Sequence, residues 1–304
     1  MQKLIFGRVL SSILSLAVLV VAVFFLSRLT GDPAALFLPS EASKEMLDNF
    51  RAQHGLNDPL LTQFGRYVWD ILHFDFGQSL RQARPAIDVV LEGFAWTFQL
   101  AVITVALVTV ASIVIGSIAA FRPGGIFDRF VSVVSLIGAS APDFWVAIVA
   151  IVIFAINLSW LPTSGTGTIL HWVLPIGVLF LRPFGLILQI VRGSMIQSLG
   201  SLYVKTARAK GVGNRSIIFV HTLRNAMLPV ITVIGDQAAA MLNGAVIVET
   251  IFGFPGVGKL MIDSIMQRDF NVVLATIMVT AVAIFIMNML IDLAYALLDP
   301  RVRT

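Results

Sequence analysis

The chain has 304 residues, of which 58% are hydrophobic and 12% are charged, and its formal net charge at pH 7 is +4. Soluble domains usually carry about 25% charged residues, so this composition argues against a water-soluble enzyme. The sequence contains no cysteine, which excludes disulfide scaffolds, thiolate metal sites and cysteine nucleophiles.

Six long hydrophobic runs predict an all-α polytopic membrane protein with six transmembrane helices. Each run reaches or nearly reaches the roughly 20 residues that cross about 30 Å of hydrocarbon. Within the third run, Pro142 lacks an N–H and is expected to kink the helix. In chain order, the predicted spans are residues 9–26, 97–120, 131–156, 172–191, 226–248 and 272–298.

These spans divide the chain into three predicted parts. Residues 1–30 form the N-terminus and the first helix, which we expect to be retained because no small-x-small cleavage site follows it. Residues 31–96 form a long external loop, a cap segment in which residues 43–53 predict a short polar helix. Residues 97–304 form a core of five helices, interrupted by a basic loop at 192–225.

The distribution of Lys and Arg predicts that both termini face the cytoplasm, because short cytoplasmic loops are enriched in these residues. The connection at 157–170 has no charged residue, whereas the loop at 192–225 has basic residues and no carboxylate. The basic residues of that loop are Arg192, Lys205, Arg208, Lys210, Arg215 and Arg224.

Three ionisable residues, Asp143, Arg182 and Asp236, are predicted at bilayer depth. A charge there is costly unless it is paired or hydrated. Two interpretations stay open: a buried Asp–Arg pair that fastens two helices, or the polar lining of a water-filled path. Helical spacing favours a path, because further polar residues share the faces of Arg182 and Asp236. The residues of this predicted path are Asp143, Arg182, Gln189, Thr232, Asp236 and Asn243.

The basic loop contains small and apolar residues at helical spacing, with basic residues between them. Gly211 follows this stretch and suits a helix C-cap, because it has no Cβ to oppose a left-handed conformation. We therefore predict a short surface helix parallel to the membrane. It is either a basic helix lying on anionic lipid or a docking element for a cytosolic protein. The residues concerned are Tyr203, Lys205, Thr206, Ala207, Arg208, Ala209, Lys210 and Gly211.

The segments 203–211 and 221–229 resemble the coupling-loop signature of ABC-type importer permeases, in the version of the dipeptide/oligopeptide/nickel branch. In this chain the signature begins with Lys205-Thr206-Ala207 where the general family has Glu-Ala-Ala. Further motifs resemble the same family in the same order along almost the whole chain. They lie at residues 31–33, 55–60, 76–79, 161–165, 254–258 and 299–303.

The resemblance implies a permease subunit of the inner membrane whose coupling loop docks on an ATPase. It implies four further components: a second homologous permease in a heterodimer, two cytosolic ATPase subunits and an extracytoplasmic solute-binding protein. The chain itself is then no enzyme and binds no cofactor, because the partner subunits use ATP and Mg. Its expected surroundings are membrane lipid and these proteins, with no nucleic acid. The two permeases together would form the path for short peptides or related solutes.

One glycine-rich segment imitates a nucleotide site. Residues 253–259 fit the G-x-x-x-x-G-K pattern, but Leu260 stands where a Ser or Thr would bind Mg²⁺. The charge distribution also places this segment outside the cell, where there is no ATP. We interpret it as a stiff external turn near the binding protein or the second permease. Its residues are Phe254, Pro255, Gly256 and Gly258.

Two questions stay open at this point. Nickel chelates and opines also travel through relatives of this kind, so the solute is not determined by the motifs. A different class, the stand-alone secondary transporter or channel, would predict internal repeats, and we find no convincing repeat. A permanent metal site is not expected, because the histidines are dispersed: His54, His73, His171 and His221.

Overall fold

The computed structural model describes residues 2–29, 34, 42–53, 55–242 and 245–298. Within these ranges the chain is helical and has no strand, and a single isolated bridge joins Gln78 and Pro85. The predicted all-α class is therefore confirmed for the described part of the chain. Asn243 and His54 lie outside the described residues, as do the motifs at 31–33 and 299–303.

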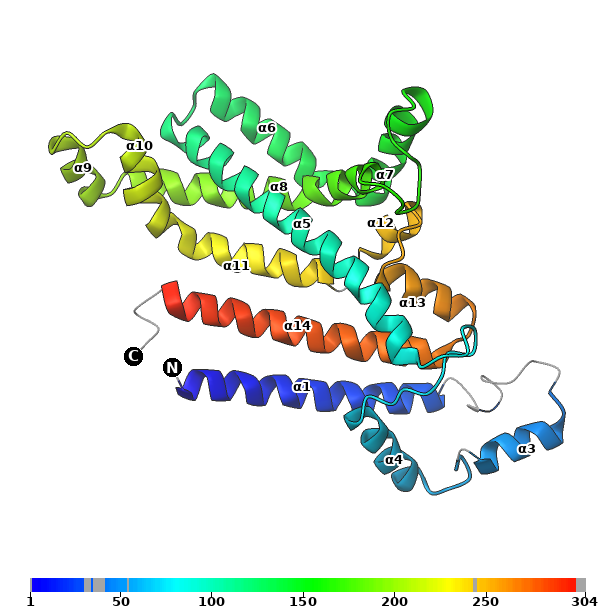
Figure 1. Cartoon of the computed structure of the whole chain (residues 1–304). Helices are drawn as coiled ribbons and strands as arrows, with labels where there is room; N and C mark the ends of the chain where they lie inside the picture. The colour runs from blue at the N-terminus through cyan, green and yellow to red at the C-terminus, as the bar shows by residue number, and fades with distance from the viewer. Residues whose placement is uncertain (1, 30–33, 35–41, 54, 243–244, 299–304) are drawn as a thin grey trace. The chain divides into compact units, whose positions relative to one another are not determined.

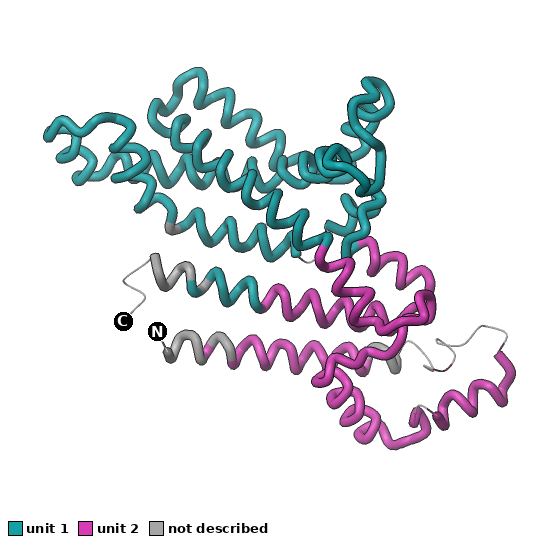
Figure 2. Tube along the Cα trace, in the orientation of Figure 1, with its two compact units in different colours: residues 1, 96–258, 286–304 teal, residues 2–95, 259–285 magenta. Residues whose placement is uncertain are grey.

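The helices form two compact units, which Figure 2 distinguishes by colour. One unit comprises residues 96–258 and 286–304 together with Met1, and the other comprises residues 2–95 and 259–285. Two long helices, α5 (Ala86–Phe121) and α14 (Phe270–Leu298), contribute residues to both units. The division at residues 30 and 96 expected from the sequence stays a prediction.

The first unit contains most of α5, the helices that follow it as far as α12, and the last part of α14 (Figure 1). Two of its elements, η1 and η2, are π-helices, a rare form that often marks functional positions. Its elements after α5 are α6 (Ile126–Ser140), α7 (Asp143–Ala150), η1 (Ile151–Asn157), α8 (Leu170–Leu199), α9 (Leu202–Ala209), α10 (Asn214–Ser216), η2 (Ile217–Thr222), α11 (Leu223–Leu242) and α12 (Val246–Ile251).

The second unit contains the N-terminal helix, the short helices after it and the first part of α14. The predicted helix at 43–53 is confirmed as α3. Its elements before α5 are α1 (Gln2–Leu29), α3 (Lys44–Gln53) and α4 (Leu60–Leu72), and nearly all of α13 (Val257–Met266) also belongs to it.

Three described helices are long and apolar enough to cross a membrane: α5, α8 and the Phe270–Ile291 part of α14. Two bent helix pairs raise the number to five if each pair counts as one span. The apolar part of α1, Leu10–Phe25, is shorter than a full span. The chain is thus helical with three to five candidate spans among its described residues, and the sixth predicted span is not confirmed by length.

The third predicted span is a broken helix. Helix α6 ends at Ser140, α7 begins at Asp143, and the pair bends by 103°. Pro142 supplies no N–H, and the residue before a proline avoids the helical region, as the extended backbone of Ala141 shows. The expected kink is confirmed, and it is sharp enough to place Asp143 in the first turn of a new helix.

The fifth predicted span also differs from a single straight helix. The stretch Asn214–Met227 and the stretch Pro229–Leu242 bend by 63°. Helix α11 ends at Leu242, and α12 begins only at Val246, so the expected span over 226–248 is wrong at its C-terminal end.

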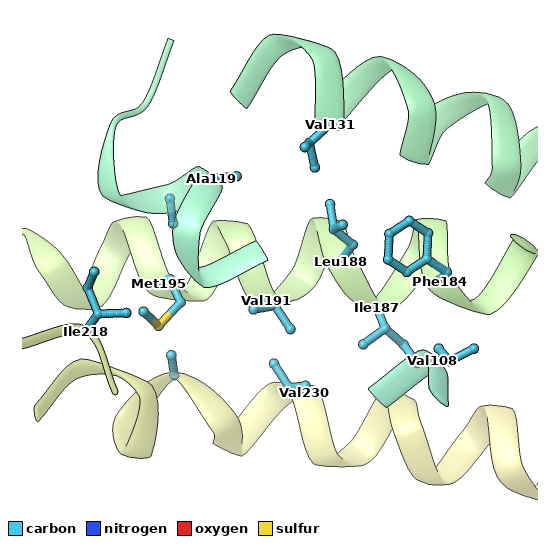
Figure 3. Packing of buried hydrophobic residues seen from close by; sticks show 12 residues of the cluster. Val108, Ala119, Val131, Phe184, Ile187, Leu188, Val191, Met195, Ile218 and Val230 are labelled. Atoms are coloured by element: carbon cyan, nitrogen blue, oxygen red, sulfur yellow. The ribbon is translucent and has the colours of Figure 1, made fainter. Parts of the chain in front are cut away.

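The core of the first unit is built around α8, which packs against α6 and α11. Glycines bring the α6 and α8 backbones together: a Cβ on Gly138 would meet the Leu181 carbonyl oxygen at 2.9 Å, and one on Gly185 would meet Ala139 N at the same distance. Small residues permit such close helix packing in membranes. Figure 3 shows the side chains that fill the rest of this core, among them Val131, Leu188, Val191, Met195 and Val230.

Candidate functional site

The loop helix expected from the sequence is present as α9. Val204 is fully buried and faces the body of the unit, where α9 packs against the π-helix η2. The opposite side exposes large apolar groups, since Leu202 is 78% exposed and Tyr203 is 41% exposed. Helix α9 is therefore attached to the unit through one face, and its other face is accessible to a binding partner.

The end of α9 is fixed by a Schellman motif. Gly211 has φ +77°, its N–H donates to the Arg208 carbonyl at 3.0 Å, and the Val212 N–H donates to the Ala207 carbonyl at 3.1 Å. This pairing of backbone groups requires a residue with a left-handed conformation, which glycine adopts without steric cost. The C-cap predicted at Gly211 is confirmed, so α9 ends at a defined point.

The basic side chains of α9 and its cap are exposed. Lys205, Arg208 and Lys210 make no ion pair with another described residue. Ala207 is half-buried, while Thr206 and Ala209 are exposed between the charges. This surface could meet an acidic protein surface or anionic lipid headgroups.

An ion pair lies at the first residue of the predicted loop, Arg192, which the structure places within α8. Asp128, in the first turn of α6, is almost completely buried and accepts two hydrogen bonds from the Arg192 guanidinium of α8, one of them Nη2 to Oδ2 at 2.8 Å. The Gly124 N–H donates to the same carboxylate at 2.8 Å. The pair ties the turn between α5 and α6 to the end of the helix that leads into α9.

Sequence reasoning missed this ion pair. It treated Arg192 as one of several cationic loop residues and did not consider Asp128. The available signal was the lone carboxylate of that turn, Asp128, between Arg122 and Arg129.

The charges predicted at bilayer depth all lie in the first unit. Arg182 and Asp236 are exposed, Asp143 is half-buried, and none of the three forms an ion pair within the described residues. Helices α7 and α8 pack together, and Arg182 is the charged group that acts electrostatically on Asp143. Arg182 thus forms no direct ion pair with Asp143 or Asp236 within the described part of the chain. Gln189 donates from Nε2 to Ser135 Oγ on α6 at 3.3 Å.

One face of α11 is left open by the rest of the unit. Asp236 and Ala240 are exposed and Thr232 is half-buried, whereas Ala226 and Val230 on the other side are buried. The open face is polar and small-sided over the length of the helix. Asn225 and Pro229 continue it toward the N-terminal end of α11.

The glycine-rich segment at 253–258 is folded around a buried carboxylate. Glu249 of α12 is fully buried and accepts hydrogen bonds from Thr97 Oγ1 at 2.7 Å and from the Gly258 N–H at 2.8 Å. Thr97 Oγ1 in turn accepts the Val257 N–H at 2.8 Å. A Cβ on Gly256 would collide with the Glu249 carboxylate. Sequence reasoning missed Glu249, because its partners are distant along the chain.

The same segment is anchored by aromatic contacts. Phe254 is fully buried, and its ring lies edge-on to Trp172 at 4.9 Å and to Trp96 at 5.7 Å. Gly256 and Gly258 are buried as well, whereas Pro255 is exposed. Of the residues expected to face a partner here, Pro255 is accessible in the single chain.

The motif at 76–79 has a structural role within the second unit. Ser79 Oγ donates to Asp269 Oδ2 at 2.5 Å, and both residues are almost completely buried. Asn271 Nδ2 donates to the Gln78 carbonyl at 2.8 Å. These bonds attach the segment before α5 to the turn between α13 and α14.

Among the described residues, no three His, Asp or Glu side chains come together as a metal site requires. His171 bonds within its own turn to Thr168, and His73 lies against Trp69. Lys259, which occupies the lysine position of the G-x-x-x-x-G-K pattern, forms an ion pair with Asp263 on α13.

Two protein families match this chain, and together their matches cover nearly its whole length. Residues 112–304 match the family described as binding-protein-dependent transport system inner membrane component. Residues 1–101 match the N-terminal family of the same membrane components.

Several relatives align over 89% or more of the chain. A probable peptide ABC transporter permease of Sinorhizobium fredii is 37% identical over 308 residues, covering 98% of each protein. The dipeptide transport system permease of Bacillus subtilis is 37% identical over 273 residues, covering 89% of each. The oligopeptide transport system permease of the same organism is 33% identical over 314 residues, covering 99% of each.

A solved structure shares the fold. The crystal structure of an amino acid ABC transporter with histidines aligns with a TM-score of 0.55 and 16% identity, covering 68% of this chain and 93% of that chain. At this identity the likeness concerns the fold alone.

Proposed function

This chain belongs to the family of binding-protein-dependent transport system inner membrane components, and on that premise we propose that it forms, with a second permease, the path by which short peptides enter the cell. The chain is a permease subunit of an ABC importer, and it is a transport protein rather than an enzyme. The peptide substrate is carried over from the names of its relatives.

The proposed membrane arrangement has six spans and both termini in the cytoplasm. Three of the proposed spans are α5, α8 and α14. The two bent helix pairs and α1 are the other three. The basic loop at 192–225 then faces the cytoplasm, as the distribution of Lys and Arg favours. The multi-pass subunit resides in the inner membrane, with residues 31–96 outside as a cap.

The main structural support for an importer subunit is helix α9, which we propose docks on an ATPase subunit. We assign it the docking role because one face is fixed by Val204 and by the Gly211 cap, while Leu202 and Tyr203 are exposed on a short, well-defined helix. Exposed large apolar groups are typical of the centres of protein–protein interfaces, and the cationic groups beside them suit an acidic partner surface. The docking residues are Tyr203, Lys205, Thr206, Ala207, Arg208, Ala209, Lys210 and Gly211.

The proposed mechanism is alternating access driven from the cytoplasm. Two ATPase subunits bind and hydrolyse ATP with Mg²⁺, and their closure displaces α9. Because α9 packs on η2 and η2 packs on α8, a rigid movement of α9 reaches the helices around α8. An extracytoplasmic binding protein supplies the solute, so this chain needs only a permissive path.

Cysteine labelling tests the docking assignment, since the natural sequence has no cysteine. A Thr206→Cys variant should react with a membrane-impermeant maleimide only in inverted vesicles. Bound ATPase subunits should slow this reaction several-fold, because Thr206 is exposed in the single chain. Thr163→Cys, a matched change at an exposed residue of the uncharged loop, should react only from the outer face.

The docking assignment fails if the thiol at 206 is labelled from outside, or if its rate is the same with and without ATPase subunits. Protection by anionic vesicles alone would identify lipid as the occupant of this surface.

We further propose that polar residues on α8 and α11 line the path, together with Asp143. The open face of α11 and the absence of a direct ion pair among these charges support this role, because unpaired charges at bilayer depth require water. One cation and two carboxylates would suit a zwitterionic peptide. The lining residues are Asp143, Arg182, Gln189, Thr232, Asp236 and Asn243.

Replacing Asp236 by Asn or Arg182 by Gln should lower peptide uptake by about tenfold, which corresponds to about 1.4 kcal/mol, while the transporter still assembles. Uptake of labelled dipeptide into vesicles with the complete transporter measures the effect. Asp263→Asn is the control, because its ion pair with Lys259 is partly exposed and contributes about 0–1 kcal/mol. Wild-type uptake in both path variants would exclude the lining role.

A competing solute class is tested in the same vesicles. Nickel chelates and opines are the alternatives within the family, and excess of either should leave dipeptide uptake unchanged. Family membership favours an importer subunit over a stand-alone secondary transporter or channel. Uptake without ATPase subunits would reverse that preference.

A further inference from the structure

Helix α4 carries an apolar face that the rest of its unit leaves uncovered. Leu61 is 83% exposed, Trp69 is 64% exposed and Leu72 is 68% exposed. At 100° per residue these three side chains and Gly65 fall within about 80° of one another. They form one continuous side of the helix, which we call the apolar face of α4.

The other two sides of α4 are occupied differently. Phe64 and Tyr67 pack against Phe24 of α1, with ring centroids 5.2 Å and 5.5 Å apart. On the remaining side, Arg66 forms an ion pair with Asp58 at 2.9 Å, in the turn before the helix. The helix therefore has three sides: one packs against α1, one is polar, and the third is the exposed apolar face.

Helix α1, on which α4 packs, also carries an exposed apolar stripe. Leu10, Leu14, Val18, Val21 and Phe25 of α1 are all exposed and recur on one side of that helix. The ring of Phe25 contacts Phe24 edge-on at 5.5 Å, and Phe24 is the residue on which α4 rests. In Figure 1, α4 lies beside the C-terminal half of α1 and turns away from its axis.

We propose that α4 is an interfacial helix whose apolar face lies in the bilayer surface, at the end of α1 that leads into the cap segment. The inference rests on the proposed six-span arrangement, in which α1 crosses the membrane, and it does not depend on docking by α9. Helices with one apolar and one polar side lie at the boundary between headgroups and acyl chains. Trp69 suits this depth, because tryptophan is enriched at membrane interfaces.

The lipid surface is favoured over a protein partner by continuity. The stripe of α1 consists of large apolar side chains, and in the proposed arrangement with six spans α1 crosses the membrane, so lipid would meet the stripe up to Phe25. Because α4 rests on the neighbouring Phe24, its apolar face would lie near the end of that lipid contact. The polar side of α4, with Thr62 and Arg66 exposed, then faces water.

Depth-dependent quenching tests the proposal in the complete transporter, reconstituted in vesicles of phosphatidylethanolamine and phosphatidylglycerol. Leu61→Cys and Leu72→Cys carry an environment-sensitive fluorophore, and Thr62→Cys on the polar side is the matched control. All three positions are exposed, so the label does not disturb packing. We expect a blue-shifted emission at 61 and 72, and several-fold stronger quenching there by shallow nitroxide lipids than at 62.

Equal quenching at all three positions would overturn the proposal. So would a label at 61 or 72 that stays in water until the solute-binding protein is added, because the apolar face would then belong to that partner. Both readings are obtained without ATP, so they remain distinct from a failure of α9 to dock.

Discussion

Replacing Asp128 by alanine is expected to lower the stability of the subunit by about 2–3 kcal/mol, because the change removes charge-assisted hydrogen bonds and leaves buried groups unpaired. The Asp128 carboxylate accepts two bonds from Arg192 and one from the Gly124 N–H. The side chain of Arg192 is 30% exposed, so water can partly compensate its charge. The effect should therefore stay below that of a fully buried pair.

Thermal unfolding in detergent, followed by a fluorescent size-exclusion signal, measures this effect. Arg129→Ala is the matched control, because it removes a neighbouring charge that is exposed and lies outside the pair. An Asp128→Asn variant should lie between the two, since its amide oxygen can still accept the Gly124 N–H. A melting temperature of Asp128→Ala equal to that of Arg129→Ala would contradict the assigned role.

The same variant should also weaken coupling. Arg192 lies near the end of α8, and α9 begins at Leu202 after a short turn. Without the ion pair, that end of α8 is no longer tied to the turn between α5 and α6. ATP hydrolysis by the complete transporter should then depend less on solute than in the wild type.

Local chemistry explains which parts of this fold can be predicted from the sequence. The hydrophobic runs locate the long helices α5, α8 and α14, because bilayer thickness fixes a length that few other structures need. Gly211 predicts the end of α9 and Pro142 predicts the break between α6 and α7, since each acts through its own backbone. The angle of the break depends on packing against α8, and the sequence does not contain it.

The non-local contacts could not be predicted in this way. Asp128 and Arg192 are 64 residues apart, and Thr97 and Glu249 are 152 residues apart. A single sequence shows the chemical type of each residue but does not show which distant residue it contacts in the fold. The buried Glu249 therefore resembled any carboxylate of an external loop, and the glycines after it were interpreted as part of a stiff external turn. The structure explains why glycine is needed at these positions: the Glu249 carboxylate occupies the space that a Cβ atom would take.

The largest effects are expected at this carboxylate. Glu249 of α12 accepts hydrogen bonds from the Thr97 hydroxyl and from the Gly258 N–H in the first turn of α13. Glu249→Ala leaves these donors buried and unpaired, and should cost about 2–4 kcal/mol. Gly256→Ala keeps the carboxylate but forces a methyl group into it, and overpacking of this kind costs about 1–3 kcal/mol. Gly256 lies outside the left-handed region, so the backbone itself tolerates alanine.

The two changes should not add in a double-mutant cycle. When Glu249 is already alanine, the Cβ at 256 enters the space that the carboxylate has left, so Gly256→Ala should cost little more. Gly258→Ala is the matched control, because its Cβ would also meet the backbone of Val246 at 2.8 Å. Its cost should persist whether or not Glu249 is present. Melting temperatures that fall by the sum of the two single effects at 256 would show that the carboxylate does not determine the need for glycine there.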